Sequence, residues 1–90
     1  MFGFKNSLGQ RRERLFTVLD IGTEFVKVLV CAVQGKEVEV LGKGLVRQNP
    51  GEMESGAITD SAGVLQHCHE AMAEAEKMAG ESPTMLIMGI

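Results

Sequence analysis

Residues Val18–Val28 read VLDIGTEFVKV, in which two apolar runs flank a short polar turn. The first run, LFTVLDI at 15–21, is apolar or β-branched at nearly every position, which predicts a strand covered on both faces. The second run, FVKVLVCAV at 25–33, resumes directly after the turn at Gly22, and so short a connection joins antiparallel strands. This stretch therefore predicts a β-hairpin at the start of the fold.

A third run, VEVLGKGLVRQ at 38–48, follows a glycine-containing turn and extends the hairpin into a three-stranded antiparallel meander. Its first residues alternate, which predicts that Val38 and Val40 point inward and the neighbouring glutamates outward. Gly42 and Gly44 interrupt the run and predict a β-bulge or the close approach of another backbone.

A helix is expected after the loop NPGEMESG at 49–56. Asp60 suits the N-cap and Gly80 the residue that follows the last turn, with Pro83 preventing a restart. The final run, TMLIMGI at 84–90, is typical of a buried strand. The order β-β-β-α-β predicts an α/β fold that is incomplete at residue 90. Apolar residues with a period near 3.6 mark the expected buried face of the helix: Val64, Leu65, Cys68, Met72, Ala75, Met78 and Ala79.

The composition is that of a globular protein, with 44% hydrophobic and 23% charged residues, which argues against disorder. Ninety residues make one small domain at most, and the lack of Trp and Tyr indicates that part of a larger core lies elsewhere. Charge is spread unevenly: residues 1–15 carry four basic side chains and one acidic, the remainder five basic and eleven acidic. A nucleic-acid-binding body should be basic, so no nucleic acid is expected as a partner.

Residues 1–14 are expected to form a flexible basic tail, without the apolar core of a signal peptide. Three apolar residues there accompany basic ones, but the segment is too short and glycine-broken for a convincing membrane-surface helix. No run approaches the roughly 18 apolar residues that would span a bilayer. Cys31 and Cys68 are expected to be buried thiols in a reducing, cytoplasmic setting.

The first hairpin carries more chemistry than its turn needs. Asp20 ends the first strand, where its carboxylate can meet a hydrated Mg²⁺ ion. Gly22 lets backbone N–H groups approach an anion, and Thr23 can donate its hydroxyl to a phosphate oxygen. Lys27 on the second strand offers a positive charge to a β- or γ-phosphate. These groups suit a magnesium nucleotide; the alternative is a plain turn capped by Asp20, with Lys27 extended into solvent.

This hairpin resembles the first phosphate motif of the actin, hexokinase and Hsp70 type of ATPase, in which D-x-G-[ST] follows the first strand. Actin-like members often carry a lysine seven residues after the aspartate, as Lys27 follows Asp20. The longer pattern is similar to the FtsA family of bacterial cell-division proteins, with its LDIGTxxVxxLV, IGxG, G-x-I-x-D and AE-x-MAG segments. Glu24 departs from the more usual serine or other polar residue, and its charge would repel a phosphate if it pointed inward. The matching segments are 19–30, 41–44, 56–60 and 75–80.

The resemblance implies that residues 15–90 are the N-terminal part of an actin-like (RNase H-like) ATPase domain that binds ATP and Mg²⁺. Asp20 would position the metal through water, and no catalytic residue is assigned. The family further implies a cytoplasmic, self-polymerising protein at the inner membrane, bound through a C-terminal helix absent here, that recruits FtsZ and other division proteins. The 90 residues alone are expected not to hold ATP tightly, because the later motifs are missing. The phosphates would be received by Gly22, Thr23, Glu24 and Lys27.

Three alternatives remain. A pilus-assembly scaffold of the PilM family shares DIGTxxVKV, although the segments 56–60 and 78–80 favour FtsA. A sugar or acid kinase of the same superfamily would need a catalytic aspartate further downstream. A small interaction domain without nucleotide is the third, if the chain truly ends at Ile90.

Other motifs have plainer interpretations. In HCHE at 67–70, the two histidines lie about 200° apart on a helix, so they cannot share a metal with Cys68. A core Cys68 between surface histidines is expected instead. The run GKGLVR lacks the third glycine of a dinucleotide loop and the Lys-Ser/Thr of a P-loop. Core packing is expected for Met72, Met78, Met85 and Met88.

Overall fold

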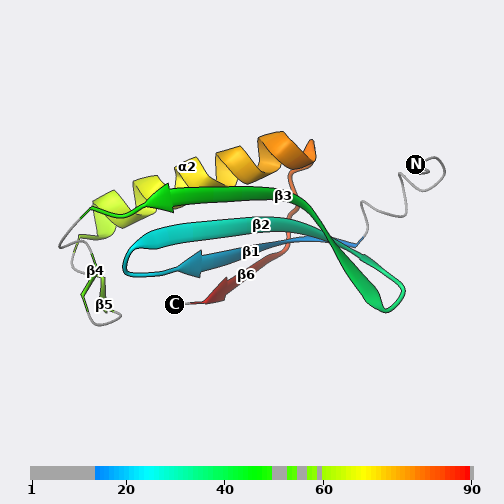
Figure 1. Cartoon of the computed structure of the whole chain (residues 1–90), viewed down its shortest axis with the longest axis horizontal. Helices are drawn as coiled ribbons and strands as arrows, with labels where there is room; N and C mark the ends of the chain where they lie inside the picture. Colours follow the sequence, from blue (N-terminus) through cyan, green and yellow to red (C-terminus); the bar gives the residue numbers. More distant parts are fainter. Residues whose placement is uncertain (1–13, 50–52, 55–56, 59, 90) are drawn as a thin grey trace.

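The structure, a computed structural model, describes residues 14–49, 53–54, 57–58 and 60–89. A sheet of long strands carries one helix along one of its faces (Figure 1). This arrangement confirms the expected α/β character, and the main sheet and the helix follow the expected order of three strands, helix and strand, with two short strands inserted before the helix. The elements are β1 (Leu15–Ile21), β2 (Phe25–Gln34), β3 (Glu37–Arg47), β4 (Met53–Glu54), β5 (Ala57–Ile58), α2 (Ser61–Ala79) and β6 (Leu86–Gly89).

The main sheet has the strand order β3-β2-β1-β6. Neighbours along β1, β2 and β3 are antiparallel, which confirms the predicted meander. β6 pairs in parallel with the other edge of β1. Just before β6 begins, the Met85 carbonyl accepts a hydrogen bond from the Thr17 N–H at 2.9 Å. A parallel neighbour needs a long crossover, which α2 supplies. The segment predicted as loop at 49–56 contributes β4, which pairs antiparallel with β5.

Both predicted ends of the helix are confirmed. Asp60 is the N-cap, and its Oδ1 accepts a hydrogen bond from the Gly63 N–H at 3.1 Å. Gly80 ends α2 with a φ of 73°, and its N–H donates to the Glu76 carbonyl at 2.8 Å. A side chain would strain this left-handed conformation, so glycine marks the end of the helix.

Two glycines of β3 let the helix lie directly on the strand. A Cβ added at Gly42 would collide with the Ala75 carbonyl oxygen, and one at Gly44 with the Ala71 carbonyl oxygen. Ala71 and Ala75 are fully buried, so small residues line both sides of this contact. The predicted close approach of another backbone is therefore confirmed, and α2 packs mainly against β3 and β2.

The β-bulge anticipated in the same stretch is also present. Val30 on β2 lies opposite Gly42. The next residue, Cys31, lies opposite Val40, so that Leu41 is the extra residue on β3. A bulge increases the local twist, and beyond it the β2–β3 hairpin twists away from the sheet (Figure 1).

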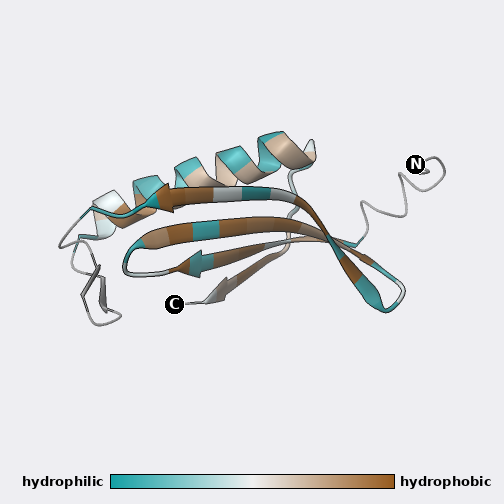
Figure 2. Ribbon diagram, in the orientation of Figure 1, coloured by the Kyte–Doolittle hydropathy of each residue, from teal (hydrophilic) through white to brown (hydrophobic). Residues whose placement is uncertain are grey.

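The core lies between α2 and the sheet, and hydrophobic residues concentrate on the long strands (Figure 2). The expectation that residues 15–21 are covered on both faces is wrong in the described residues. Phe16 and Val18 are half-buried and Asp20 is exposed, because α2 covers only one face of the sheet. The buried cluster comprises Leu19, Ile21, Val26, Val28, Val30, Val64, Cys68, Ala71 and Ala75.

The inward orientation predicted for Val38 and Val40 is wrong. These side chains are 60% and 54% exposed. Ala79, the last residue of α2, already lies against Gly42, so the helix ends before it can cover the tip of the β2–β3 hairpin. The alternation in the sequence correctly indicated a strand, but in the described residues no second layer covers this part of it.

The final strand and part of the helix are also less buried than predicted. All four residues of β6 are exposed, because β6 is an edge strand that α2 does not reach. Leu65 and Met78 of α2 are 58% and 65% exposed, although they were expected on the buried face. Of the methionines predicted in the core, only Met72 packs against it, whereas Met78, Met85 and Met88 are exposed.

Candidate functional site

The β1–β2 hairpin places Asp20 and Lys27 directly opposite each other. They are partners in the antiparallel register, which sets their Cβ atoms about 5 Å apart on one face of the sheet. Asp20 lies between Leu19 and Ile21, whose side chains are buried on the helix side, so Asp20 faces the other side. Both Asp20 and Lys27 are exposed. The carboxylate and the ammonium group predicted to act together therefore share one accessible face.

The turn that follows Asp20 is a tight one. The Gly22 N–H donates to the Phe25 carbonyl at 2.9 Å, which closes the hairpin. Thr23 and Glu24 are exposed at its tip, within the same hairpin end as Asp20 and Lys27. The structure thus brings the predicted residues to one end of the β1–β2 pair. The side chain of Glu24 is exposed to solvent there.

Gln48 holds this turn from the end of β3, and it was not predicted to do so. Its backbone N–H donates to the Glu24 carbonyl at 2.8 Å, and its side-chain Nε2 donates to the Gly22 carbonyl at 3.2 Å. Only 4% of Gln48 is exposed, so these bonds form away from competing water. One buried residue therefore contacts the turn on both sides of Thr23.

His67 of α2 completes the connection. Its Nδ1 lies 2.7 Å from Gln48 Oε1, and the ring is half-buried. His67 was expected on the surface, so that prediction is wrong, whereas the expected exposure of His69 and burial of Cys68 are confirmed. A chain of hydrogen bonds thus runs from the helix through Gln48 to the turn.

The alternation of buried and exposed residues along β3 was the signal that could have identified Gln48. Gly44, Val46 and Gln48 alternate with exposed residues and share the side of the strand that faces α2. A polar residue that falls on the buried side of a strand needs hydrogen-bond partners, because an unpaired buried amide is costly. The partners themselves, which come from β1 and α2, could not be read from the sequence.

A second cation lies beside the turn. Arg47 is the register partner of Phe25, and its guanidinium carbon is 5.8 Å from the centre of the Phe25 ring. Such a contact is weakly attractive at an exposed site and restrains the arginine side chain. Leu45 is the register partner of Lys27, and Arg47 lies two residues further along the same strand. Arg47 is therefore on the same face of the sheet as Lys27.

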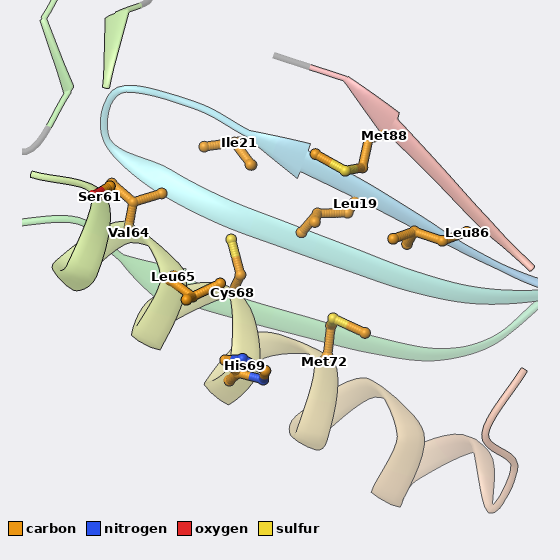
Figure 3. A pocket seen from close by; sticks show the side chains of 10 residues that line it. All are labelled: Leu19, Ile21, Ser61, Val64, Leu65, Cys68, His69, Met72, Leu86 and Met88. Atoms are coloured by element: carbon orange, nitrogen blue, oxygen red, sulfur yellow. The ribbon is translucent and has the colours of Figure 1, made fainter. Parts of the chain in front are cut away.

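An apolar groove lies on the opposite, helix side of the sheet, with a volume of about 400 Å³ (Figure 3). Leu19, Leu86 and Met88 line it from the strands, and Leu65 and Met72 from the helix. Its lining is almost entirely apolar, and it is separated by the sheet from Asp20 and Lys27. The groove therefore does not suit phosphates or a metal ion.

Several other expectations bear on the site. In the part of the chain that the structure describes, no three His, Cys, Asp or Glu side chains gather as metal ligands. Within the same residues, no helix has the length and apolar character needed to cross a membrane. The predicted basic tail at 1–14, apart from Arg14, lies outside the described residues, as do Gly56 and Thr59 of the segment 56–60.

Comparison with solved structures identifies a similar fold in a glycerol dehydratase reactivase. The TM-score is 0.57 and the sequence identity 19%, over 83% of this chain and 12% of that protein. At this identity the likeness concerns the fold alone. The chain thus shares its fold with a small part of a much longer protein.

Comparison of sequences identifies a more specific relative. Over 79 residues, or 88% of the chain, the sequence is 34% identical to the cell division protein FtsA of Streptococcus pneumoniae. The chain spans 17% of the length of that relative. No family model matches the chain.

Proposed function

We propose that this chain is part of an FtsA-like, actin-like ATP-binding protein and that its first hairpin receives the phosphates of a magnesium nucleotide. Asp20 would position Mg²⁺ through a water molecule. The turn at Gly22, Thr23 and Glu24 would offer N–H and hydroxyl donors, and Lys27 a positive charge. When bound, the metal would neutralise part of the phosphate charge.

The observation that carries this proposal is the cross-strand pair of Asp20 and Lys27 beside the turn. A carboxylate suits a hard cation that keeps part of its water shell, and the facing lysine suits a phosphate oxygen. Both side chains are exposed on the side of the sheet that α2 leaves open, so a ligand has access to them. The donors present therefore fit the group that the proposal places there.

The cellular role is proposed from the similarity to FtsA. The protein would polymerise on the cytoplasmic face of the inner membrane, tether the FtsZ ring to it and recruit other division proteins. Membrane attachment would use a C-terminal helix beyond these residues. The 34% identity supports FtsA over a PilM-like pilus scaffold and over a small interaction domain without nucleotide.

The nucleotide site is tested by replacing Asp20 in the complete gene product. Asp20→Ala should weaken the binding of Mg·ATP roughly tenfold or more, which corresponds to about 1.4 kcal/mol, because the metal loses its anchor. Isothermal titration calorimetry measures the dissociation constant. The loss should shrink when EDTA replaces Mg²⁺, because the carboxylate acts on the nucleotide only through the metal.

Glu37→Ala is the matched control, since Glu37 is an exposed acid at the far end of the same sheet. This variant should bind Mg·ATP like the wild type. Equal affinities for the wild type and Asp20→Ala, or no binding by the wild type, would exclude the proposed site and leave the interaction domain as the better hypothesis.

A further inference from the structure

We propose that Gln48 is a positioning residue for the phosphate turn and that His67 holds its amide in the orientation this role requires. The inference rests on the proposed function, because it concerns how the turn at Gly22–Glu24 is presented to a phosphate. Neither residue belongs to the motif that identified the turn. They reach it from the end of β3 and from α2.

The first step concerns the peptide plane between Gly22 and Thr23. Among the described residues no peptide bond is cis, so the Thr23 N–H points opposite to the Gly22 carbonyl. Gln48 Nε2 donates to that carbonyl at 3.2 Å and draws it inward toward the buried end of β3. The Thr23 N–H is consequently turned away from Gln48, toward the exposed side of the turn, where an anion can accept from it.

The second step concerns the other side of Thr23. The Gln48 backbone N–H donates to the Glu24 carbonyl at 2.8 Å. The carbonyls of Gly22 and Glu24, which lie on either side of the Thr23–Glu24 peptide, are thus fixed by a single residue. A turn whose donors are oriented before the ligand arrives loses less conformational entropy on binding. Gln48 therefore contributes to affinity without touching the phosphate.

The third step concerns the orientation of the Gln48 amide. The reverse orientation would place Oε1 against the Gly22 carbonyl, so that two acceptors would face each other. His67 selects the productive orientation, because its Nδ1 lies 2.7 Å from Oε1 and can donate to it. A hydrogen at Nδ1 is required for this arrangement, in either the neutral ring or the imidazolium.

The test uses Gln48→Glu in the complete gene product. Glutamate retains the backbone N–H and an oxygen facing His67 Nδ1, but it replaces the donor to the Gly22 carbonyl with an acceptor. The dissociation constant for Mg·ATP should rise roughly tenfold or more, as expected when a buried donor is exchanged for a repelling acceptor. His67→Ala should weaken binding by a smaller factor, roughly threefold, because it only frees the amide to rotate.

The control variants separate this role from general stability. His69→Ala removes the neighbouring, exposed histidine of the same helix and should leave the affinity unchanged. Gly80→Ala strains the far end of α2 and lowers the melting temperature without contacting the turn. It should leave Mg·ATP affinity within about twofold of the wild type once the protein is folded.

A spectroscopic signature distinguishes positioning from packing. In protein labelled with ¹⁵N-threonine, the Thr23 amide resonance should shift on addition of Mg·ATP in the wild type and in His69→Ala. It should shift much less in Gln48→Glu. Hydrogen–deuterium exchange of the segment 19–25 should also be faster in Gln48→Glu than in Gly80→Ala.

The outcomes separate the two proposals. If the wild type binds Mg·ATP and Gln48→Glu binds it equally well, the positioning role is overturned while the nucleotide site stands. If Asp20→Ala and Gln48→Glu both weaken binding and His69→Ala does not, both proposals are supported. If the wild type fails to bind Mg·ATP, both are overturned.

Discussion

At the scale of single residues, the strand register of the first hairpin defines the site, because it places Asp20 opposite Lys27. Asp20 and Lys27 are seven residues apart in the chain, yet they are direct neighbours across β1 and β2. Such cross-strand neighbours interact without any tertiary contact, so this pair was within reach of the sequence. Gln48 and His67 are not, because they meet the turn from strand and helix positions 26 residues and more away from Gly22.

Both cysteines are also defined by their surroundings. Cys31 and Cys68 are buried free thiols, and burial raises the pKa of each because the thiolate loses its hydration. Each should therefore react with a disulfide reagent at pH 8 roughly an order of magnitude more slowly in the folded protein than in urea. Absorbance of the released thiolate measures both rates. Equal rates in the two conditions would contradict the burial.

The same shift sets a direction for stability. The folded state holds the thiol protons to higher pH than the unfolded state does. The contribution of the two cysteines to the free energy of unfolding is therefore complete below the pKa of the unfolded thiols. It declines as the pH rises through the higher pKa of the folded protein. The free energy of unfolding should accordingly fall in this alkaline window, and less so after Cys68→Ser.

At the scale of elements, the contact between α2 and β3 depends on two glycines. Gly44→Ala should lower the free energy of unfolding by about 1–3 kcal/mol, because its Cβ would meet the backbone of Ala71, which can move only with the helix. Urea denaturation followed by circular dichroism measures the change. The helix content of the folded state should remain, since the caps at Asp60 and Gly80 are unaffected.

Gly89→Ala is the matched control for this change, because a Cβ at Gly89 meets nothing within 4 Å in the described residues. It carries the same gain of a methyl group in a strand without the collision. If Gly44→Ala and Gly89→Ala shift the urea midpoint equally, the helix does not rest on β3 as the structure describes.

At the scale of the whole molecule, apolar surface remains uncovered in the described residues. Ile87 is 50% exposed on the edge strand β6, and the apolar groove lies on the other side of that strand. An edge strand with apolar side chains is a template for pairing with another chain. The isolated 90-residue chain should therefore self-associate, which sedimentation velocity measures as a concentration-dependent increase in mass.

Ile87→Lys should reduce this association, because a charge on the edge strand opposes pairing. Lys77→Arg, a change on the exposed surface of α2 that retains the charge, should not alter it. A wild-type chain that stays monomeric and unfolds in one cooperative thermal transition would contradict this prediction.

The strand positions that were predicted to be buried but are exposed share one physical cause. Val38, Val40 and Leu86 carry patterns typical of strands, and strands do form there. Their burial was predicted because an apolar side chain is usually covered by a second layer. In the described residues, the only such layer is α2, which ends opposite Gly42 and does not extend over β6.

The sequence by itself determined the local features: the first hairpin with Asp20 opposite Lys27, the capped helix, and the glycines that let the helix approach. Each follows from short-range stereochemistry, namely strand alternation, cap hydrogen bonds and the missing Cβ of glycine. The tertiary structure alone decided which apolar faces are covered and that Gln48 and His67 support the turn. Those outcomes depend on the path of α2 across the sheet, which no local pattern specifies.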